Sequence, residues 1–420
     1  MKVFKFGGAS VNSIERIRNV SKILLQYPQE KILVVISAMG KTTNALEKVA
    51  EAFFNNKKED ALQLFEQVKR QHINTAKYVL ITAFNATLEK LSQLFTEVEW
   101  ALHDKPIREF DYYYDQLVCS GELFSSTIMS AFLNEENVPN QWFDVRDVFR
   151  TDDNFRDANL DWDFSLTRVK DLVLPKFESS NLLVTQGFIG ATDENESTTL
   201  GREGSDYSAA VFANMLDAES LTIWKDVEAV MNADPREFPD AQPISELNYE
   251  EVIEMAYYGA QVIHPKTIKP LQNKSIPLHV KCFLDPSLSG TLIRNGHLKG
   301  LPPIIVLKQD QVLIHLHSKD FSFVGEKPVA RLYQLFAEIK LKPNLMQTGA
   351  ISLQVCLDDR SEKIGKLAAA ASEIFDVEIE KGLTLLTIRH YNGEILERLT
   401  KGKSIVLRQQ SPETAQVLMK

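Results

Sequence analysis

The sequence predicts an α/β protein in which a mainly parallel sheet precedes a second region of mixed strands and helices. A strand, a glycine-containing loop and a helix follow one another from residue 2 to residue 24, and the same order begins again at Ile32. Apolar runs at 182–185 and 221–224 are typical of further buried strands. These repeats favour β-α-β winding with right-handed crossovers. A chain of 420 residues is too long for one core, so we expect two or three domains.

Composition limits the classes of function. With 44% hydrophobic residues and a formal net charge of −10, the chain has no dense Lys/Arg patch of the kind that binds nucleic acid. The first residues have the pattern of a strand. No apolar run is nearly as long as the roughly 18 residues that a membrane-spanning helix needs. Cys119, Cys282 and Cys356 lie far apart, as expected of structural thiols in a reducing compartment. We therefore expect a cytoplasmic protein without nucleic-acid or membrane partners.

The first strand, Lys2–Phe6, ends beside a glycine pair. The loop Gly7–Ser10 follows it, and Asn12-Ser13-Ile14-Glu15 resembles the capping box of a helix. Open α/β sheets bind ligands where strand ends face helix N-termini, so Lys5 is a candidate phosphate-binding charge. The alternative is a solvated strand lysine beside an ordinary turn.

A second unit carries small and hydroxyl residues after its strand. Ile32–Ile36 leads into Ser37–Asn44, where Thr42, Thr43 and Asn44 are either ligand-binding residues or no more than a helix N-cap. From Glu47 to about Leu102 the pattern is almost entirely helical, which indicates a helical insertion or lid. A further helix, predicted over 112–133, places Glu122 next to a glycine within an apolar stripe. Such a glutamate is either solvated or able to meet the ammonium of a ligand.

The stretch 199–210 organises the rest of the chain. Two glycines bracket Arg202 and Glu203, and Ser205-Asp206 leads into an alanine-rich helix. Small residues let the backbone approach a ligand, Ser205 or Asp206 is expected to cap the helix, and helix N-terminal amides favour an anion. This predicts a phosphate and carboxylate site, although plain loop chemistry can produce the same pattern.

Charged residues also follow the strand at 221–224. Lys225 and Asp226 come directly after it, and Asp234-Pro235-Arg236 follows about ten residues later. We expect two cations and two carboxylates at the same edge of the sheet. The eight histidines form no metal set, and we expect His264 and His279 to be structural.

The character of the chain changes after a Gly/Pro-rich polar stretch at 287–303. Apolar runs and helical patterns then follow in the order β-α-β-β-α-β up to residue 388, which is the ferredoxin-like order. A shorter partial repeat occupies the last residues, and this region offers no catalytic constellation.

Seven motifs in fixed order resemble those of aspartate kinase. They are Lys5-Phe6-Gly7-Gly8-Ala9-Ser10, Gly121-Glu122-Leu123, Gly187-Phe188-Ile189-Gly190, Gly201-Arg202-Glu203-Gly204-Ser205-Asp206-Tyr207, Trp224-Lys225-Asp226-Val227, Asp234-Pro235-Arg236 and Gly259-Ala260-Gln261-Val262-Ile263-His264-Pro265. Kinases of glutamate, acetylglutamate, carbamate and UMP share the strand-glycine-helix start but not the whole set.

The resemblance implies a domain plan. Residues 1–293 would form a catalytic domain with the three-layer α-β-α amino-acid kinase fold and a helical insertion at about 47–133. Residues 294–303 would be a linker, and 304–420 would be tandem ferredoxin-like ACT modules, the second of them short. ACT modules generally pair through edge strands, so the resemblance implies a homodimer or a higher homo-oligomer.

It also implies an activity. The chain would use ATP to phosphorylate the β-carboxylate of L-aspartate, giving 4-phospho-L-aspartate, the first step towards lysine, threonine and methionine. Mg²⁺ would be held mainly by the ATP phosphates, and an amino-acid effector would bind in the ACT region. A β-carboxylate with a pKa near ~3.9 is already an ionised nucleophile, so no general base is needed. The alternatives are another amino acid as acceptor, or a catalytically weakened regulatory subunit.

The resemblance assigns roles to particular residues. Catalytic roles fall to Lys5, Gly8 and Asp206. Substrate binding falls to Ser37, Thr43, Glu122, Phe188, Arg202 and Ser205, with Arg202 on the α-carboxylate and Glu122 near the ammonium. Nucleotide binding falls to Gly7, Ser10, Lys225, Asp226, Met231, Arg236 and Gln261, and a regulatory role to Asn344, Gln347, Thr348 and Gly349.

The chain departs from the family pattern at several positions. Ala9 replaces a usual Thr, and Glu203 replaces a usual Gly, which adds negative charge near the expected phosphates. Gln261 stands where a Lys is common, and our hypothesis is that Lys225 supplies the missing charge. In the regulatory segment, Asn344 and Gly349-Ala350 replace an Asp and a Ser-Glu pair, which predicts weak or absent inhibition by lysine.

Overall fold

The computed structural model describes residues 1–296, 298 and 300–420, which form two compact units. The first unit comprises Met1–Val230, Pro243–Ile253 and Val262–Leu298, and the second comprises Met231–Gln242, Glu254–Gln261 and Lys299–Lys420. Two short segments within the expected catalytic domain thus pack with the C-terminal region. Residues 297 and 299 of the expected linker lie outside the described residues.

An eight-stranded sheet organises the first unit. Its order is β10-β12-β11-β7-β1-β2-β4-β3, and every neighbouring pair is parallel except β11 with β12. The strands are β1 (Lys2–Phe6), β2 (Ile32–Ile36), β3 (Gln141–Trp142), β4 (Leu182–Gln186), β7 (Ser220–Lys225), β10 (Glu246–Asn248), β11 (Leu278–Cys282) and β12 (Thr291–Arg294). The central strands are fully buried, as their unbroken apolar sequences predict.

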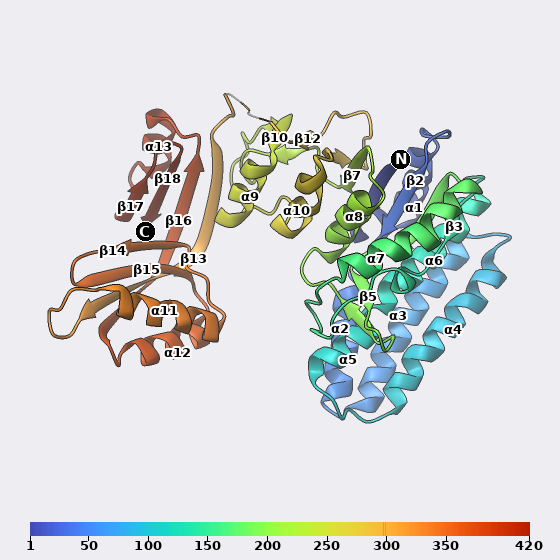
Figure 1. Ribbon diagram of the computed structural model, residues 1–420, viewed down its shortest axis with the longest axis horizontal. Coiled ribbons are helices and arrows are strands. Elements are labelled where there is room, and N and C mark those ends of the chain that lie inside the picture. Colours follow the sequence, from blue (N-terminus) through green and yellow to red (C-terminus); the bar gives the residue numbers. More distant parts are fainter. Residues whose placement is uncertain (297, 299) are drawn as a thin grey trace. The chain divides into compact units, whose positions relative to one another are not determined.

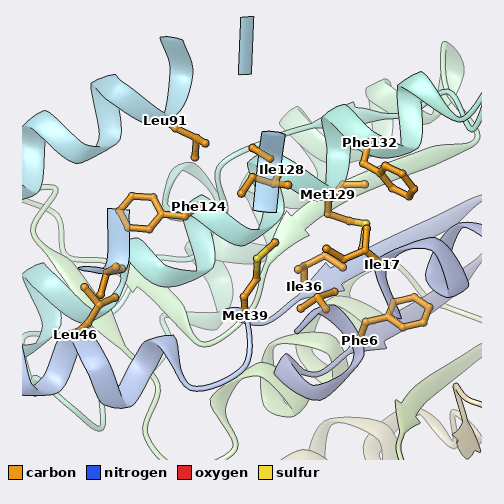
Figure 2. Close-up of a cluster of buried hydrophobic side chains, with 14 of the residues drawn as sticks. Phe6, Ile17, Ile36, Met39, Leu46, Leu91, Phe124, Ile128, Met129 and Phe132 are labelled. Atoms are coloured by element: carbon orange, nitrogen blue, oxygen red, sulfur yellow. The ribbon is translucent and has the colours of Figure 1, made fainter. Parts of the chain in front are cut away.

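Helices cover both faces of this sheet. Because side chains alternate along a strand, Phe6 and Ile36 point into an apolar cluster with Ile17 of α1 (Ile14–Leu24) and with Met129 and Phe132 of α6 (Ser120–Glu135) (Figure 2). Helix α8 (Gly204–Met215) packs against β1, β2 and β7 from the other face. The predicted three-layer α-β-α arrangement is confirmed.

The predicted helical insertion consists of five helices between β2 and β3. They are α2 (Thr42–Phe54), α3 (Lys58–Val79), α4 (Phe84–His103), α5 (Phe110–Val118) and α6. The helix predicted over 112–133 is in fact two, because the chain turns at Cys119 between α5 and α6. In Figure 1, α3, α4 and α6 run side by side, and their facing residues extend the apolar cluster.

Short elements complete the first unit, and two of them, at 230–231 and 249–258, continue into the second. They are a 3-10 turn (Gly8–Val11), a 3-10 turn (Val145–Asp147), α7 (Trp162–Arg168), a π turn (Val169–Val173), a 3-10 turn (Leu174–Glu178), the hairpin β5 (Ile189–Ala191) with β6 (Ser197–Thr199), the pair β8 (Val230–Met231) with β9 (Pro243–Ile244), α9 (Tyr249–Tyr258) and α10 (Pro265–Lys274). The ring of His264 accepts a hydrogen bond from the Lys266 N–H and caps α10. Among the described helices, none has the length and apolar character needed to cross a bilayer.

The second unit contains a six-stranded sheet in the order β14-β15-β13-β16-β18-β17. Its elements are β13 (Ile304–Ser318), α11 (Glu326–Ile339), β14 (Leu345–Thr348), β15 (Ser352–Asp358), α12 (Ser361–Ala371), β16 (Phe375–Arg389), α13 (Gly393–Thr400), β17 (Ile405–Gln410) and β18 (Thr414–Met419). Helices α11 and α12 cover one face of the strands up to β16 (Figure 1). This is the predicted ferredoxin-like βαββαβ module.

The second, shorter module obtains a strand from the beginning of β13. Residues 304–308 of β13 pair with 385–389 of β16, whose other neighbour is β18. Helix α13 packs on this part of the sheet, and Phe238 and Ala241 from the segment 231–242 join its apolar core. The sequence shows a short repeat because its fourth strand comes from earlier in the chain.

Candidate active site

The parallel register brings four loops to one edge of the sheet. Phe6 of β1 aligns with Ile36 of β2 and Trp224 of β7, and Ile36 aligns with Gln186 of β4. The residues that follow these strand ends therefore meet around a cavity of about 590 Å³. Its lining comprises Lys5, Gly7, Gly8, Ala9, Ser10, Ser37, Ala38, Gly40, Thr43, Tyr114, Glu122, Arg156, Phe188, Thr199, Gly201, Arg202, Glu203, Gly204, Ser205, Asp206, Trp224, Lys225 and Asp226.

A buried ion pair lies at the centre of this lining. The Nζ atom of Lys5 is 2.6 Å from Oδ1 of Asp206, and both side chains are almost completely buried. A second ammonium, that of Lys225, lies 3.8 Å from Oδ2 of the same aspartate. Burial opposes ionisation of Asp206, but the two lysines outweigh it and hold the pKa of the carboxyl below its ordinary value.

The first glycine loop fits closely against the second loop. The Gly40 N–H donates to the Gly8 carbonyl at 3.0 Å. A Cβ atom at position 8 would lie 2.6 Å from the Ala38 carbonyl oxygen, so only glycine fits there. The predicted role of Gly8 therefore has a steric basis: its backbone forms part of the cavity wall next to Lys5.

Glu122 is a buried carboxylate with one oxygen unsatisfied. Its Oε1 atom accepts a hydrogen bond from the Ala38 N–H at 3.2 Å, whereas Oε2 has no partner among the described residues. Burial raises the pKa of Glu122 to about 8. Because a buried carboxylate is unfavourable without a partner, burial favours the protonated form of this side chain.

The loop before α8 holds the second predicted anion site. Ser205 and Asp206 lie in the first turn of α8, and the N-cap position is instead Glu203, in a left-handed conformation with φ of 54°. The expectation that Ser205 or Asp206 caps the helix is therefore wrong. Glu203 accepts a hydrogen bond from the His264 N–H at 3.0 Å, which holds its carboxylate at the cavity.

A second arginine joins Arg202 in the lining, and the sequence analysis did not identify it. The guanidinium of Arg156 lies 4.2 Å from the Tyr114 ring centre and pairs with Asp111 at 3.1 Å. In the sequence it is one of two arginines, Arg150 and Arg156, within the acidic stretch 147–163, which shows no other signal of a site.

The comparisons with known proteins agree with this geometry. The model of the amino acid kinase family matches residues 1–282. The lysine-sensitive aspartokinase 3 of Escherichia coli is 32% identical over 396 residues, covering 92% of this chain and 86% of that protein. The chain belongs to the aspartokinases. The chloroplastic aspartokinase 1 of Arabidopsis thaliana is 30% identical over 96% of this chain and 74% of its own length.

Solved structures extend the similarity to the whole fold of this aspartokinase. The crystal structure of E. coli aspartokinase III in complex with aspartate and ADP superposes with a TM-score of 0.83 at 28% identity, covering 100% of this chain and 96% of that one. The complex of the same enzyme with lysine and aspartate gives a TM-score of 0.82.

Most predicted site residues of this aspartokinase meet in one place. The cavity lining contains all the predicted catalytic and substrate-binding residues, together with Gly7, Ser10, Lys225 and Asp226. Met231, Arg236 and Gln261 belong to the second unit and are not part of the lining. Asp234 and Arg236 pair with each other at 2.6 Å in the second unit, and their expected position at the sheet edge of Lys225 stays a prediction.

Proposed function

We propose that this aspartokinase transfers the γ-phosphoryl group of ATP to the β-carboxylate of L-aspartate, giving 4-phospho-L-aspartate for the biosynthesis of lysine, threonine and methionine. One observation carries the proposal: the Lys5–Asp206 pair and the unpaired oxygen of Glu122 face one cavity. The cavity thus combines groups for a phosphate and for an ammonium. The E. coli relative was solved with aspartate and ADP.

The amino acid would lie between Arg202 and Glu122. The Arg202 guanidinium can bind the α-carboxylate with two parallel hydrogen bonds, and Glu122 can accept from the ammonium. Thr43 and Ser205 supply hydroxyl groups to the same lining. Ser37 contributes through the loop in which it lies, and Phe188 forms an apolar part of the wall. This set matches a zwitterionic amino acid better than carbamate or UMP.

The nucleotide phosphates would lie at the glycine loop. Lys5 would contact the transferring phosphoryl group, Gly7 and Gly8 let the backbone approach it, and Lys225 adds a second cation. Asp226 follows β7 at the mouth of the cavity. The nucleotide roles of Ser10, Met231, Arg236 and Gln261 remain proposals drawn from the family resemblance.

The chemistry needs positioning and charge neutralisation more than proton transfer. An aspartate β-carboxylate is ionised at neutral pH and can attack the γ-phosphorus without a general base. Among the described residues no cluster of three or more His, Cys, Asp or Glu side chains could hold a metal by itself. We propose that Mg²⁺ is held mainly by ATP oxygens, with Asp226 as the nearest free carboxylate of the lining, and that it neutralises phosphate charge.

The family resemblance also supports a proposal on assembly and location. We propose that the protein works in the cytoplasm as a homodimer or a higher homo-oligomer. Strands β14 and β17 end the six-stranded sheet and each leave one edge unpaired within the chain, and such edges can pair with a second copy. An amino-acid effector would bind in the same region.

The activity is tested by trapping the acyl phosphate. Mg·ATP and hydroxylamine with L-aspartate should give the hydroxamate, whereas glutamate, carbamate and UMP should not react. Lys5→Met should lower kcat roughly 10²-fold to 10³-fold because it removes a charge that stabilises the transition state. Lack of product with every acceptor would support the regulatory-subunit alternative, and a different preferred acceptor would replace aspartate as the substrate.

The titration of Glu122 should control the affinity for aspartate. Because burial raises the pKa of Glu122 to about 8, most of the Glu122 side chains in the free enzyme carry a proton at pH 7. Binding an ammonium requires loss of that proton, so the KM for aspartate should fall roughly tenfold per unit from pH 6.5 towards 8 and then level off. Glu122→Gln should remove this slope, and Glu136→Gln, at the exposed position directly after the same helix, should keep it. A slope that persists in Glu122→Gln would contradict the assignment.

Lys225 should contribute to ATP binding. Its Nζ donates to the Val262 carbonyl at 2.7 Å and remains part of the cavity lining, whereas Gln261 is exposed in the second unit. Lys225→Met should raise the KM for ATP about tenfold, equivalent to one ion pair of about 1.4 kcal/mol. Gln261→Lys in the Lys225→Met background should recover part of this loss. An unchanged KM for ATP in Lys225→Met would refute the compensation.

The regulatory segment already contains an ammonium of its own. Lys308 Nζ donates to Oδ1 of Asn344 at 2.8 Å and to Asp358 at 3.3 Å, and the Asn344 amide donates to Asp358 and to Gln311 at 2.7 Å. Gln347, Thr348 and Gly349 are exposed beyond this network and offer no carboxylate. An effector ammonium placed here would meet like charge.

Inhibition by lysine should therefore be weak, with less than half of the activity lost at about 1 mM lysine. A dissociation constant above about 1 mM corresponds to weak binding. Asn344→Asp should increase the sensitivity because it adds an anionic partner. Lys308→Met combined with Asn344→Asp should increase it further by removing the competing ammonium. Initial rates over a lysine titration measure all three, and half-inhibition of the unmodified enzyme in the submillimolar range would show that the reasoning is wrong.

A further inference from the structure

We propose that Asp115 is a positioning residue for the amino-acid substrate, because it joins the two loops that carry the arginines of the cavity. This inference rests on the proposed aspartate kinase activity. Asp115 lies in α5 and is not part of the cavity lining. It acts through Arg156 and through the segment that leads to Arg202.

Three donors converge on this completely buried carboxylate. Its Oδ2 atom accepts hydrogen bonds from the Thr199 N–H at 2.8 Å and the Arg156 N–H at 3.0 Å. Its Oδ1 atom accepts from the Thr199 hydroxyl at 2.6 Å. No cation pairs with Asp115 among the described residues. The carboxylate therefore binds two backbone segments that lie more than forty residues apart in the chain.

The two segments also bind each other directly beside Asp115. The Ala158 N–H donates to the Thr199 carbonyl at 3.0 Å. Gly201 has φ of 75°, and a Cβ atom there would lie 2.5 Å from Oδ1 of Asp157, which shows how closely the loops approach. Only Leu200 and Gly201 separate Thr199 from Arg202, so a shift of Thr199 is passed to that guanidinium.

Arg156 depends on the same carboxylate. This residue has φ of 69°, a conformation that costs free energy for a non-glycine residue and needs support from its surroundings. The support comes from the hydrogen bond between its N–H and Asp115, and from the Tyr114 ring beneath its guanidinium. Arg156 and Arg202 line one cavity, and L-aspartate brings two carboxylates to it.

Burying the carboxylate of Asp115 costs free energy, which argues for a specific role. Burial raises the pKa of Asp115 to about 6 even though its three hydrogen bonds lower it. An apolar residue on α5 could fill the same space, but it could not hold two N–H groups and a hydroxyl. A merely structural residue would affect stability alone, whereas a positioning residue must affect the affinity for one substrate.

The test measures KM for each substrate in hydroxamate assays of the full chain. Asp115→Ala removes all three acceptors and should raise the KM for aspartate roughly tenfold or more, with the KM for ATP and kcat changed less than about threefold. Asp115→Asn should rescue the KM to within about threefold. Its oxygen can accept from both N–H groups, and its amide can donate to the Thr199 hydroxyl, which then acts as acceptor.

Two further variants complete the test. Glu109→Gln, at the exposed start of the same helix, should leave every constant unchanged. Thr199→Val removes only one hydrogen bond and keeps the backbone, so it supplies a milder form of the change if Asp115→Ala does not fold. It should raise the KM for aspartate in the same direction and by a smaller factor.

The outcomes distinguish a failure of the proposed function from a failure of the positioning role of Asp115. An unmodified enzyme that forms no aspartate hydroxamate contradicts the proposed function, independently of Asp115. An active enzyme in which Asp115→Ala raises the KM for aspartate and ATP in parallel, or lowers thermal stability with both KM values unchanged, overturns the positioning role. Failure of Asp115→Asn to restore the KM for aspartate also overturns it.

Discussion

The buried pair between Lys5 and Asp206 is the interaction on which the site depends. It joins the central strand β1 to the first turn of α8, and it lies where four parallel strands end. Removing Asp206 would leave the buried Lys5 without its partner, and breaking a buried pair in this way typically costs about 3–5 kcal/mol. Lys225, 3.8 Å from the same carboxylate, leaves the cluster with one more cation than anions. That excess charge suits a site that must receive phosphates.

The cavity lining contains two buried carboxylates whose pKa values are shifted in opposite directions. Asp206 is ionised because two lysines outweigh the cost of burial. At Glu122 burial outweighs the hydrogen bond from the Ala38 N–H and the charge of Lys5, and it raises the pKa to about 8. The first neutralises lysines that would otherwise repel one another, and the second lacks the cation that would make its ionisation favourable. The difference follows from their neighbours, since both are acids on helices that cover the sheet.

The sequence predicts what local patterns and parallel strand ends determine. The convergence of Lys5, Arg202 and Lys225 follows from parallel winding, because strand ends in such a sheet share one edge. Arg156 and Asp115 were missed because their roles depend on contacts more than forty residues distant, which no periodicity encodes. The placement of Met231 and Gln261 in the second unit was missed for the same reason, since short segments between strands carry no signal of their packing partner.

The two modules of the second unit are joined through shared strands. Strands β13 and β16 each have 15 residues and run through both modules, so the two modules share their central strands. Their pairing shifts register between Lys308 and Gln311, where Asp310 adopts a left-handed conformation with φ of 51°. Lys308 and Gln311 both contact Asp358 and Asn344 at this irregularity. This hydrogen-bonded network therefore lies at the point where the strands shared by both modules change register.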